Sequence, residues 1–261
     1  MLTPQLNREW IGWIVINGLP AVVATLGFFF STRWGRDLFG WPVVPRAAAI
    51  ALGIGFLMRS AMYVQQFTAG SYQEMRWLHW GNVVFAGVLL GVTCIWGELF
   101  HWRRFTAILW LFLYIEEPVW MLTLLPRSEA LVATQAALSS VPVNALLQGA
   151  LFLEAGLMLI IGVVIFLNRP GTMSPQPDLM SARVLAGWPL GYVLWAPTLA
   201  LAPSFTEARG GILVNLVWLA AWVIAPFIFR KHFDLAHRNT RIWLAVCAVL
   251  LVLLLVGFLI Q

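Results

Sequence analysis

Apolar residues in this chain fall into long runs that are separated by short polar segments. Each run is about 20 residues long, the length that an α-helix needs to cross the hydrocarbon core of a bilayer. The runs are continuously apolar and do not alternate with polar positions, so they predict membrane-spanning helices and exclude a transmembrane β-barrel. We expect eight spans, at residues 10–30, 46–66, 77–96, 105–125, 145–167, 184–203, 211–229 and 242–260.

The composition agrees with this fold class, an all-α integral membrane protein built as a helix bundle. The chain has 261 residues, of which 61% are hydrophobic and 10% are charged, and its mean hydropathy is +0.84. Soluble domains carry about 25% charged residues, so this chain lies far outside that class. The lipid bilayer is therefore the expected partner along most of the surface.

The basic residues indicate how the chain is oriented. Although the pI is near 9.9, these residues are scattered between the spans, which predicts no nucleic-acid partner. The loops after spans 1, 3, 5 and 7 carry most of them, namely Arg33, Arg36, Arg46, Arg103, Arg104, Arg169, Arg183, Arg230, Lys231, Arg238 and Arg241. By the positive-inside rule these loops face the cytoplasm and both chain termini face the periplasm. We expect a multi-pass protein of a bacterial inner membrane.

One longer loop divides the predicted spans. Residues 168–183 (NRPGTMSPQPDLMSAR) are rich in proline and are expected to lie in the cytoplasm. They separate five spans, within residues 1–167, from three spans, within residues 184–261. The sequence thus predicts a five-helix membrane core that holds a polar pocket, followed by a three-helix membrane bundle.

Ionisable residues interrupt the apolar spans at similar depths. Arg59 lies roughly 20 Å from the cytoplasmic end of its span, and Glu116 and Glu117 lie roughly 17–18 Å from the same side. Glu154 lies roughly 15 Å from the opposite side. A lone charge at such a depth costs at least about 2.5 kcal/mol, so we expect these groups to face the bundle interior and to pair. Pro118 follows the two glutamates and loosens the helix there.

Further polar side chains share helix faces with these groups. Together they predict a pocket, formed by spans 2 to 5 and open to the periplasm, whose ligand-binding residues are Arg59, Tyr63, Gln66, His79, Asn82, Tyr114, Asn144 and Gln148. Three acids against one arginine leave an excess of carboxylate, so at least one acid is expected to hold a proton or a cation. A purely structural polar cluster that holds the helices together is the alternative.

The segment RWLHW, residues 76–80, resembles the start of a span in bacterial b-type cytochrome subunits, the membrane anchors of hydrogenases and formate dehydrogenases. The resemblance covers only this part of the chain, and it implies haem b or quinone as cofactors and a role in electron transport. Haems of that family need a second histidine inside a span, whereas His101, His232 and His237 fall in cytoplasmic loops. The remaining pair of haem ligands is His79 with Met62.

The paired glutamates carry a looser resemblance. IEEPVWM, residues 115–121, with WGELFHW upstream, is similar to the I-E-E-x-L-F-F segment of small lycopene cyclases. This implies a membrane-embedded lipid or isoprenoid enzyme in which a buried glutamic acid protonates a polyene. Those proteins repeat the motif in a second half, and no second acid pair follows Glu154 here.

Three functions therefore stay open. The first expectation is a membrane subunit of a bacterial energy-converting complex that handles quinone, protons or a pigment, with other subunits of the complex as partners. In that case the glutamates carry protons, and Arg59, Tyr114 and His79 bind a polar head group. The second is a proton- or cation-coupled transporter of a small solute, and the third is the lipid or isoprenoid enzyme.

Overall fold

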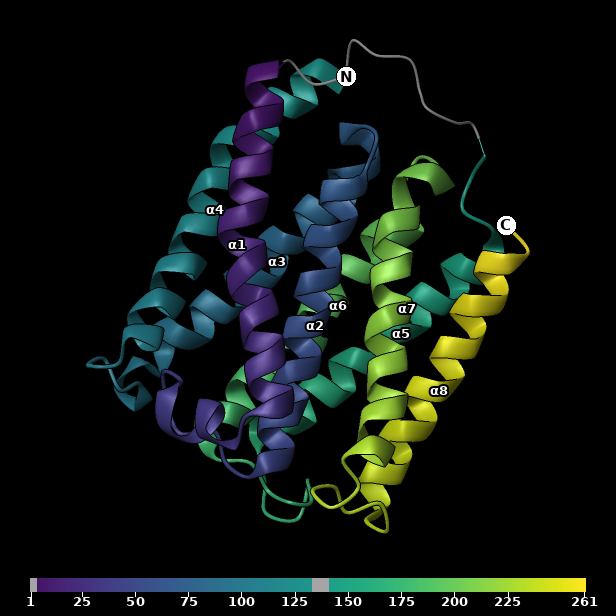
Figure 1. Cartoon of the computed structure of the whole chain (residues 1–261). Helices are drawn as coiled ribbons and strands as arrows, with labels where there is room; N and C mark the ends of the chain where they lie inside the picture. The colour runs from purple at the N-terminus through teal and green to yellow at the C-terminus, as the bar shows by residue number, and fades with distance from the viewer. Residues whose placement is uncertain (1–3, 133–140) are drawn as a thin grey trace.

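The computed structural model describes residues 4–132 and 141–261, which form a bundle of long helices without a strand (Figure 1). The long helices are α1 (Pro4–Phe30), α2 (Arg46–Thr68), α3 (Tyr72–Ile95), α4 (Phe105–Val132), α5 (Ala145–Leu167), α6 (Leu179–Ala200), α7 (Phe205–Ile228) and α8 (Arg238–Leu259). Two short helical turns, η1 (Trp34–Leu38) and η2 (Gly97–Leu99), follow α1 and α3. The first helix begins and the last helix ends toward the same end of the bundle (Figure 1).

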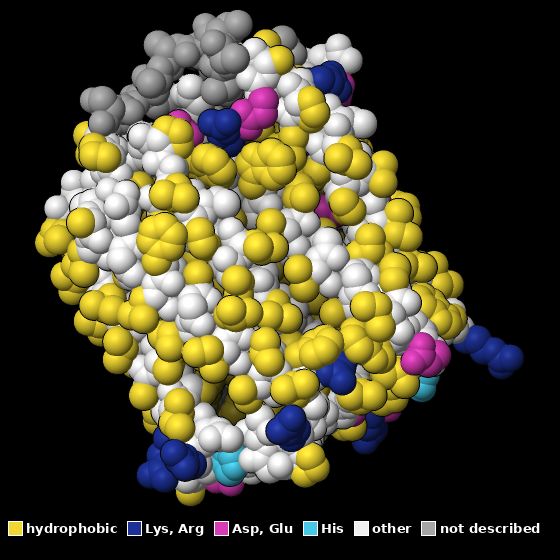
Figure 2. Space-filling view, turned by 180° about the vertical axis from the view of Figure 1, so that it is seen from behind, with side chains coloured by type: hydrophobic (Ala, Val, Ile, Leu, Met, Phe, Trp, Pro, Cys, Tyr) yellow, Lys and Arg dark blue, Asp and Glu magenta, His cyan; other side chains and the backbone are white. Residues whose placement is uncertain are grey.

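We call this the terminal end and the opposite one the basic end, because the arginine-rich loops after α1, α3, α5 and α7 lie there. In a view from behind, most charged side chains lie toward the two ends, and hydrophobic side chains cover the surface between them (Figure 2). A bilayer requires this distribution of its spanning proteins, since charged side chains are costly at its centre.

The prediction of an all-α membrane bundle is confirmed at the level of helix content and apolarity. Seven of the described helices are long and apolar enough to cross a membrane. The eighth long helix, α6, does not belong to this group, although a span was expected at residues 184–203. It carries Arg183, Pro189 and Pro197, and most of its side chains are buried inside the bundle.

Polar caps fix where several helices begin. The side chains of Ser71, Asn144, Asp178 and Ser204 each accept a hydrogen bond from the backbone N–H three residues later. Such a bond satisfies one of the donors that the first turn of a helix leaves free. The cap at Asp178 starts α6 inside the segment expected to be a loop, so the expected loop boundary at residue 183 was wrong.

Helix α2 occupies the centre of the bundle. Most of its side chains are buried, and it packs against α1, α3, α6 and α7. The pair formed by α5 and α6 has the largest interface, and α3 packs against α4, α6 and α7. Two helices of the expected C-terminal bundle, α6 and α7, therefore share one interior with the helices before them. The division into two domains stays a prediction.

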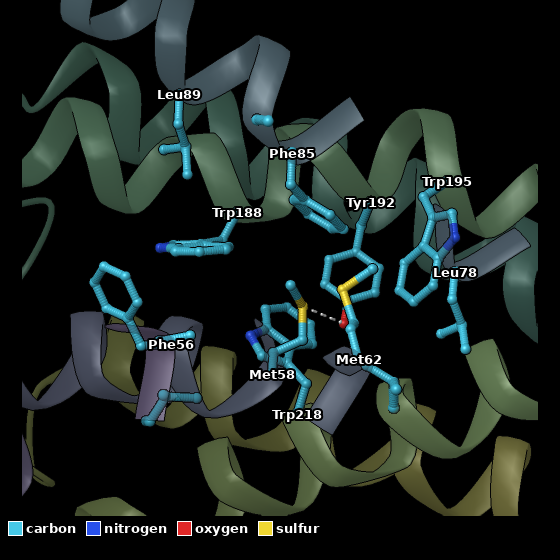
Figure 3. Close-up of a cluster of buried hydrophobic side chains, with 14 of the residues drawn as sticks. Phe56, Met58, Met62, Leu78, Phe85, Leu89, Trp188, Tyr192, Trp195 and Trp218 are labelled. Carbon is cyan, nitrogen blue, oxygen red and sulfur yellow. Dashed lines mark hydrogen bonds between the residues drawn. The ribbon is translucent and has the colours of Figure 1, made fainter. Parts of the chain in front are cut away.

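Aromatic side chains fill the interior between α2, α3, α6 and α7 (Figure 3). Phe85 of α3 lies edge-on to Tyr192 and Trp195 of α6, with ring centroids 5.4 and 5.6 Å apart. Tyr192 stacks on Trp218 of α7 at 4.3 Å, and its hydroxyl donates a hydrogen bond to the sulfur of Met58 on α2 at 3.0 Å. This packing joins four helices through side chains that solvent does not reach.

Gly191 allows α6 to approach α3 closely, and its replacement tests this packing. A Cβ atom added at Gly191 would lie 2.3 Å from the ring of Phe85, which is fully buried and has no room to move. Gly191→Ala is expected to lower the free energy of unfolding by about 1–3 kcal/mol. Thermal unfolding in detergent measures the loss. Gly156→Ala is the matched control, because a Cβ there meets open space; equal melting temperatures for the two variants would contradict the packing.

Candidate functional site

A buried ion pair between Arg59 of α2 and Glu117 of α4 lies inside the bundle. Both carboxylate oxygens of Glu117 accept hydrogen bonds from Nη2 of Arg59. The two side chains are only 5% and 2% exposed. Nη1 of Arg59 donates to the amide oxygen of Asn82 on α3 at 2.6 Å, so one guanidinium joins three helices.

Tyr63 completes the ring of contacts around the ion pair. Its hydroxyl accepts a hydrogen bond from Nη2 of Arg59 at 2.6 Å and donates one to Oε1 of Glu117 at 3.0 Å. Arg59 and Tyr63 are four residues apart on α2 and so lie on the same face. Tyr114, one turn before Glu117 on α4, is buried beside them. The sequence-based pairing of Arg59 with an acid is confirmed by these contacts.

The neighbouring acid, Glu116, faces a different helix. Its Oε2 accepts a hydrogen bond from the amide of Asn17 on α1 at 3.2 Å, and its Oε1 has no hydrogen-bond partner within the described chain. Adjacent residues of a helix point about 100° apart, which explains why the two glutamates have separate partners. Glu116 is partly exposed, whereas Glu117 is buried.

A cavity of about 100 Å³ extends from the ion pair toward the basic end. Arg59, Tyr63 and Glu117 line its inner part, and its outer part lies between α1, α4 and the segment around η1, where Trp34 and Thr106 line it. The pocket was expected between spans 2 to 5, whereas this cavity is lined mainly by α1, α2 and α4, so its expected helices were partly wrong. The reason is that α1 packs beside α2 and α4 and closes this cavity, while α3 and α5 supply none of its lining. The side of the membrane to which it opens stays a prediction.

Unpaired polar atoms lie on the other side of the ion pair, toward the terminal end. They belong to the side chains of Trp13, Gln66, His79 and Asn82, all of which are at most 5% exposed. A buried polar group without a partner costs free energy, and in folded proteins ordered water usually satisfies it. These atoms therefore mark places for internal water between Arg59 and the terminal end.

A second group of charged residues lies at the terminal end, beyond the unpaired polar atoms of Trp13, Gln66, His79 and Asn82. Arg76 of α3 forms an ion pair with Glu129 of α4 at 2.8 Å and lies 3.7 Å from Glu207 of α7. The hydroxyl of Tyr72 also donates a hydrogen bond to Glu129 at 3.3 Å. Arg76 and Glu129 are each about a quarter exposed, at 27% and 26%, so this group of charges reaches the surface of the bundle.

His79 is enclosed by aromatic side chains, and its role as a haem ligand stays a prediction. Its ring is fully buried and stacks on Trp10, with centroids 3.7 Å apart, and it also packs against the rings of Trp13 and Tyr72. Both ring nitrogens lack a hydrogen-bond partner within the described residues. His79 does not line the cavity beside the ion pair. His79 therefore belongs with Trp13, Gln66 and Asn82, the buried polar side chains whose unpaired atoms can bind internal water.

Glu154 does not join the Arg59 cluster, contrary to expectation. It is fully buried on α5, and its Oε2 accepts a hydrogen bond from the amide of Asn215 on α7. Helix α5 packs mainly against α6 and α8, which keeps Glu154 away from Arg59 of α2 and Glu117 of α4. Asn144 caps α5 and binds the carbonyl oxygen of Gly257 at 2.8 Å, and Gln148 follows one turn later on the same helix.

Some residues of the site were not foreseen from the sequence. Asn17 and Asn215 hold the two glutamates that have no arginine partner. Each is an amide inside an otherwise apolar run, and such residues are known to bind across helices in membranes. Isolated amides within the spans were therefore the available signal.

Comparison with protein-family models, with curated proteins and with solved structures gave no match. The likeness of residues 76–80 to b-type cytochrome anchors thus stays an expectation. Function is therefore inferred from the geometry of the cluster around Arg59.

Removal of one partner from the ion pair is expected to have unequal effects. An arginine keeps its charge, whereas a carboxylate without a partner can take up a proton. Glu117→Leu should therefore destabilise the protein more than Arg59→Leu, with a loss of roughly 3–5 kcal/mol. The double variant should be no less stable than Glu117→Leu, because it leaves no unpaired arginine. Thermal unfolding in detergent of the wild type, the two single variants and the double variant gives the four stabilities of this double-mutant cycle.

The matched control for this cycle is the pair of Arg127 with Glu9, which also joins α1 and α4 but is partly exposed, at 48% and 28%. Exposed pairs contribute about 0–1 kcal/mol, so Glu9→Gln should change stability little. Strictly additive losses for Arg59→Leu and Glu117→Leu would show that the two groups do not depend on each other.

Proposed function

We propose that this protein is a proton-handling membrane subunit in which Glu117 and Glu116 carry protons beside the fixed charge of Arg59. The observation that supports this proposal is the position of the ion pair between two different polar regions. On one side a cavity extends toward the basic end, and on the other a row of unpaired polar atoms extends toward Arg76 and Glu129.

Such an arrangement offers protons a route from each side to the ion pair. The cavity is large enough for several waters at about 10–15 Å³ each, and its polar inner end can hold them. On the opposite side, waters between Asn82, His79 and Gln66 would satisfy the atoms that now lack partners. In both regions the water molecules and side chains can pass protons along hydrogen bonds.

Glu117 is the group at which the two routes meet. When it takes up a proton, Arg59 loses its counter-charge but keeps its bonds to Asn82 and Tyr63. Glu116, the next residue on α4, is the second carboxylate within the same region and has one oxygen free to accept a proton. The permanent charge of Arg59 makes the loss of a proton from Glu117 favourable again, which completes the cycle.

The proposal includes eight membrane crossings, with both chain termini in the periplasm of a bacterial inner membrane. In support, α1 begins and α8 ends toward one end of the bundle (Figure 1), and the loops after α1, α3, α5 and α7, which carry arginines, lie at the other. The less apolar α6 is accepted as a span because its neighbours shield most of it from lipid. As a subunit of an energy-converting complex, the protein would act with partner subunits that drive the proton movement.

Proton flux into liposomes that contain the purified protein tests the proposed function. A potassium diffusion potential supplies the driving force, and a trapped pH-sensitive dye reports the flux. The wild-type protein is expected to conduct protons, and Glu117→Gln is expected to reduce the flux to that of empty liposomes. Glu9→Gln, which alters an exposed acid of the pair with Arg127, should conduct as the wild type does. No flux through the wild-type protein, or equal flux through Glu117→Gln, would contradict the proposal.

Cysteine labelling tests the number of crossings. Single cysteines are placed at Gln5 and Ile260, near the two ends of the chain, in a variant in which Cys94 and Cys247 are replaced by serine. An impermeant maleimide added to spheroplasts should label both positions. An even number of crossings brings both termini to the same face, and in the proposed orientation this is the outer face. Labelling of only one of them would show that the number is odd and that α6 does not cross.

A further inference from the structure

A second and larger cavity, of about 450 Å³, lies at the basic end of the bundle. Small side chains of α2, including Ala48 and Ala51, form its inner wall, and α5, α7 and α8 form the other walls. Its volume lies within the range of about 300–1,000 Å³ that is usual for small-molecule sites. No residue of the ion-pair cluster lines it, so it is separate from the proposed proton site.

Hydrogen-bond donors without acceptors surround this cavity. Trp222 and Trp243 line it, and they also line an adjoining cavity of about 20 Å³ together with Trp188 and Trp218. The indole N–H groups of all four tryptophans are buried and have no partner within the described chain. In Figure 3 the nitrogens of Trp188 and Trp218 both point away from Tyr192, toward the same side. An indole N–H only donates, so the missing partner is an acceptor.

The lining excludes a charged ligand. Among the described residues that line the two cavities, none is an acid, an arginine, a lysine or a histidine. A buried charge without a counter-charge is costly, so a neutral molecule fits this site. The smaller cavity has room for about one water, which can carry hydrogen bonds from the deeper tryptophans to an oxygen in the larger cavity.

The depth of the donors favours a ring over a phospholipid head group. At helical rise, the four tryptophans lie roughly 8–15 Å along their helices from the basic end. The ester groups of a phospholipid stay at the membrane interface, whereas a neutral ring enters the hydrocarbon region. The indole rings also offer flat faces, which suit stacking against a planar molecule.

The route into the cavity runs through its side wall. At the basic end, Ser174 donates a hydrogen bond to Asp234 at 3.0 Å, and the amide of Asn239 donates to the carbonyl oxygen of Thr172 at 2.8 Å. These bonds fasten the loop before α6 over the cavity. The lining residues Ile160 of α5 and Ile242 of α8 are 62% and 49% exposed, and they face the lipid when the bundle is in a membrane.

We propose that this cavity binds a lipid-soluble quinone, whose ring carbonyl oxygens accept hydrogen bonds from Trp222 and Trp243. The prenyl tail leaves between α5 and α8 into the bilayer. The two helices are held together at the terminal end, where Asn144 binds Gly257, and the cavity separates them at the basic end. The site adds a ligand to the proposed function and does not depend on it.

The test measures binding of decylubiquinone to the purified full-length protein by thermophoresis, with a fluorescent label on the exposed Cys94. We expect saturable binding to the wild-type protein. Trp222→Phe/Trp243→Phe keeps aromatic rings but removes two donors, and should weaken binding about tenfold. Ala51→Leu, which adds volume where the two cavities meet, should weaken it at least as much. Gly156→Leu, a matched addition on the open face of α5, should bind as the wild type does.

The melting temperature of each variant shows whether it is folded. If the double variant Trp222→Phe/Trp243→Phe is not folded, the single variant Trp243→Phe takes its place. A second arm repeats the titration with short-chain phosphatidylglycerol. Tighter binding of phosphatidylglycerol than of decylubiquinone would overturn the proposal in favour of a lipid site. Absence of quinone binding, or equal binding by the wild type, the tryptophan variants and Ala51→Leu, would overturn it altogether.

Discussion

A guanidinium in the interior of a helix bundle keeps its charge, so the helices around it must supply acceptors. For Arg59 these are Glu117 of α4, Asn82 of α3 and Tyr63 of its own helix. The bonds fix how far α3 and α4 are shifted along α2 and how α4 is rotated, which turns Glu116 toward α1. The cavity on one side and the unpaired polar atoms on the other both follow from the place of this pair.

The helices and much of this cluster could be predicted from the sequence, because ionisable residues inside apolar runs are rare and helical spacing shows which of them share a face. Arg59 and Tyr63 were found in this way. The prediction for Glu154 was wrong because depth along one helix does not tell which neighbour a side chain faces. That depends on helix rotation and on which helices pack together. Asn17 was missed because an uncharged amide needs no counter-charge, so its place in an apolar run does not by itself predict a partner.

Two sites of opposite character lie against the same central helix. One is built around a permanent charge, and the other is lined by apolar surfaces and indole donors. Gly55 lines the smaller tryptophan-walled cavity, and Arg59 lies one turn further along α2. A movement of α2 along its axis would therefore displace the lining of both sites. This gives the fold a physical means to link occupancy of one site to the state of the other.

The modest apolarity of α6 also has a consequence for how the protein is made. A segment with an arginine and two prolines partitions poorly into lipid by itself as it leaves the ribosome. The strongly apolar α5 is synthesised just before it and shares with it the largest helix interface of the bundle. If α6 crosses the membrane as proposed, the two helices are suited to enter it together as a hairpin. A change that weakens their contact would then harm biogenesis before it harms the finished protein.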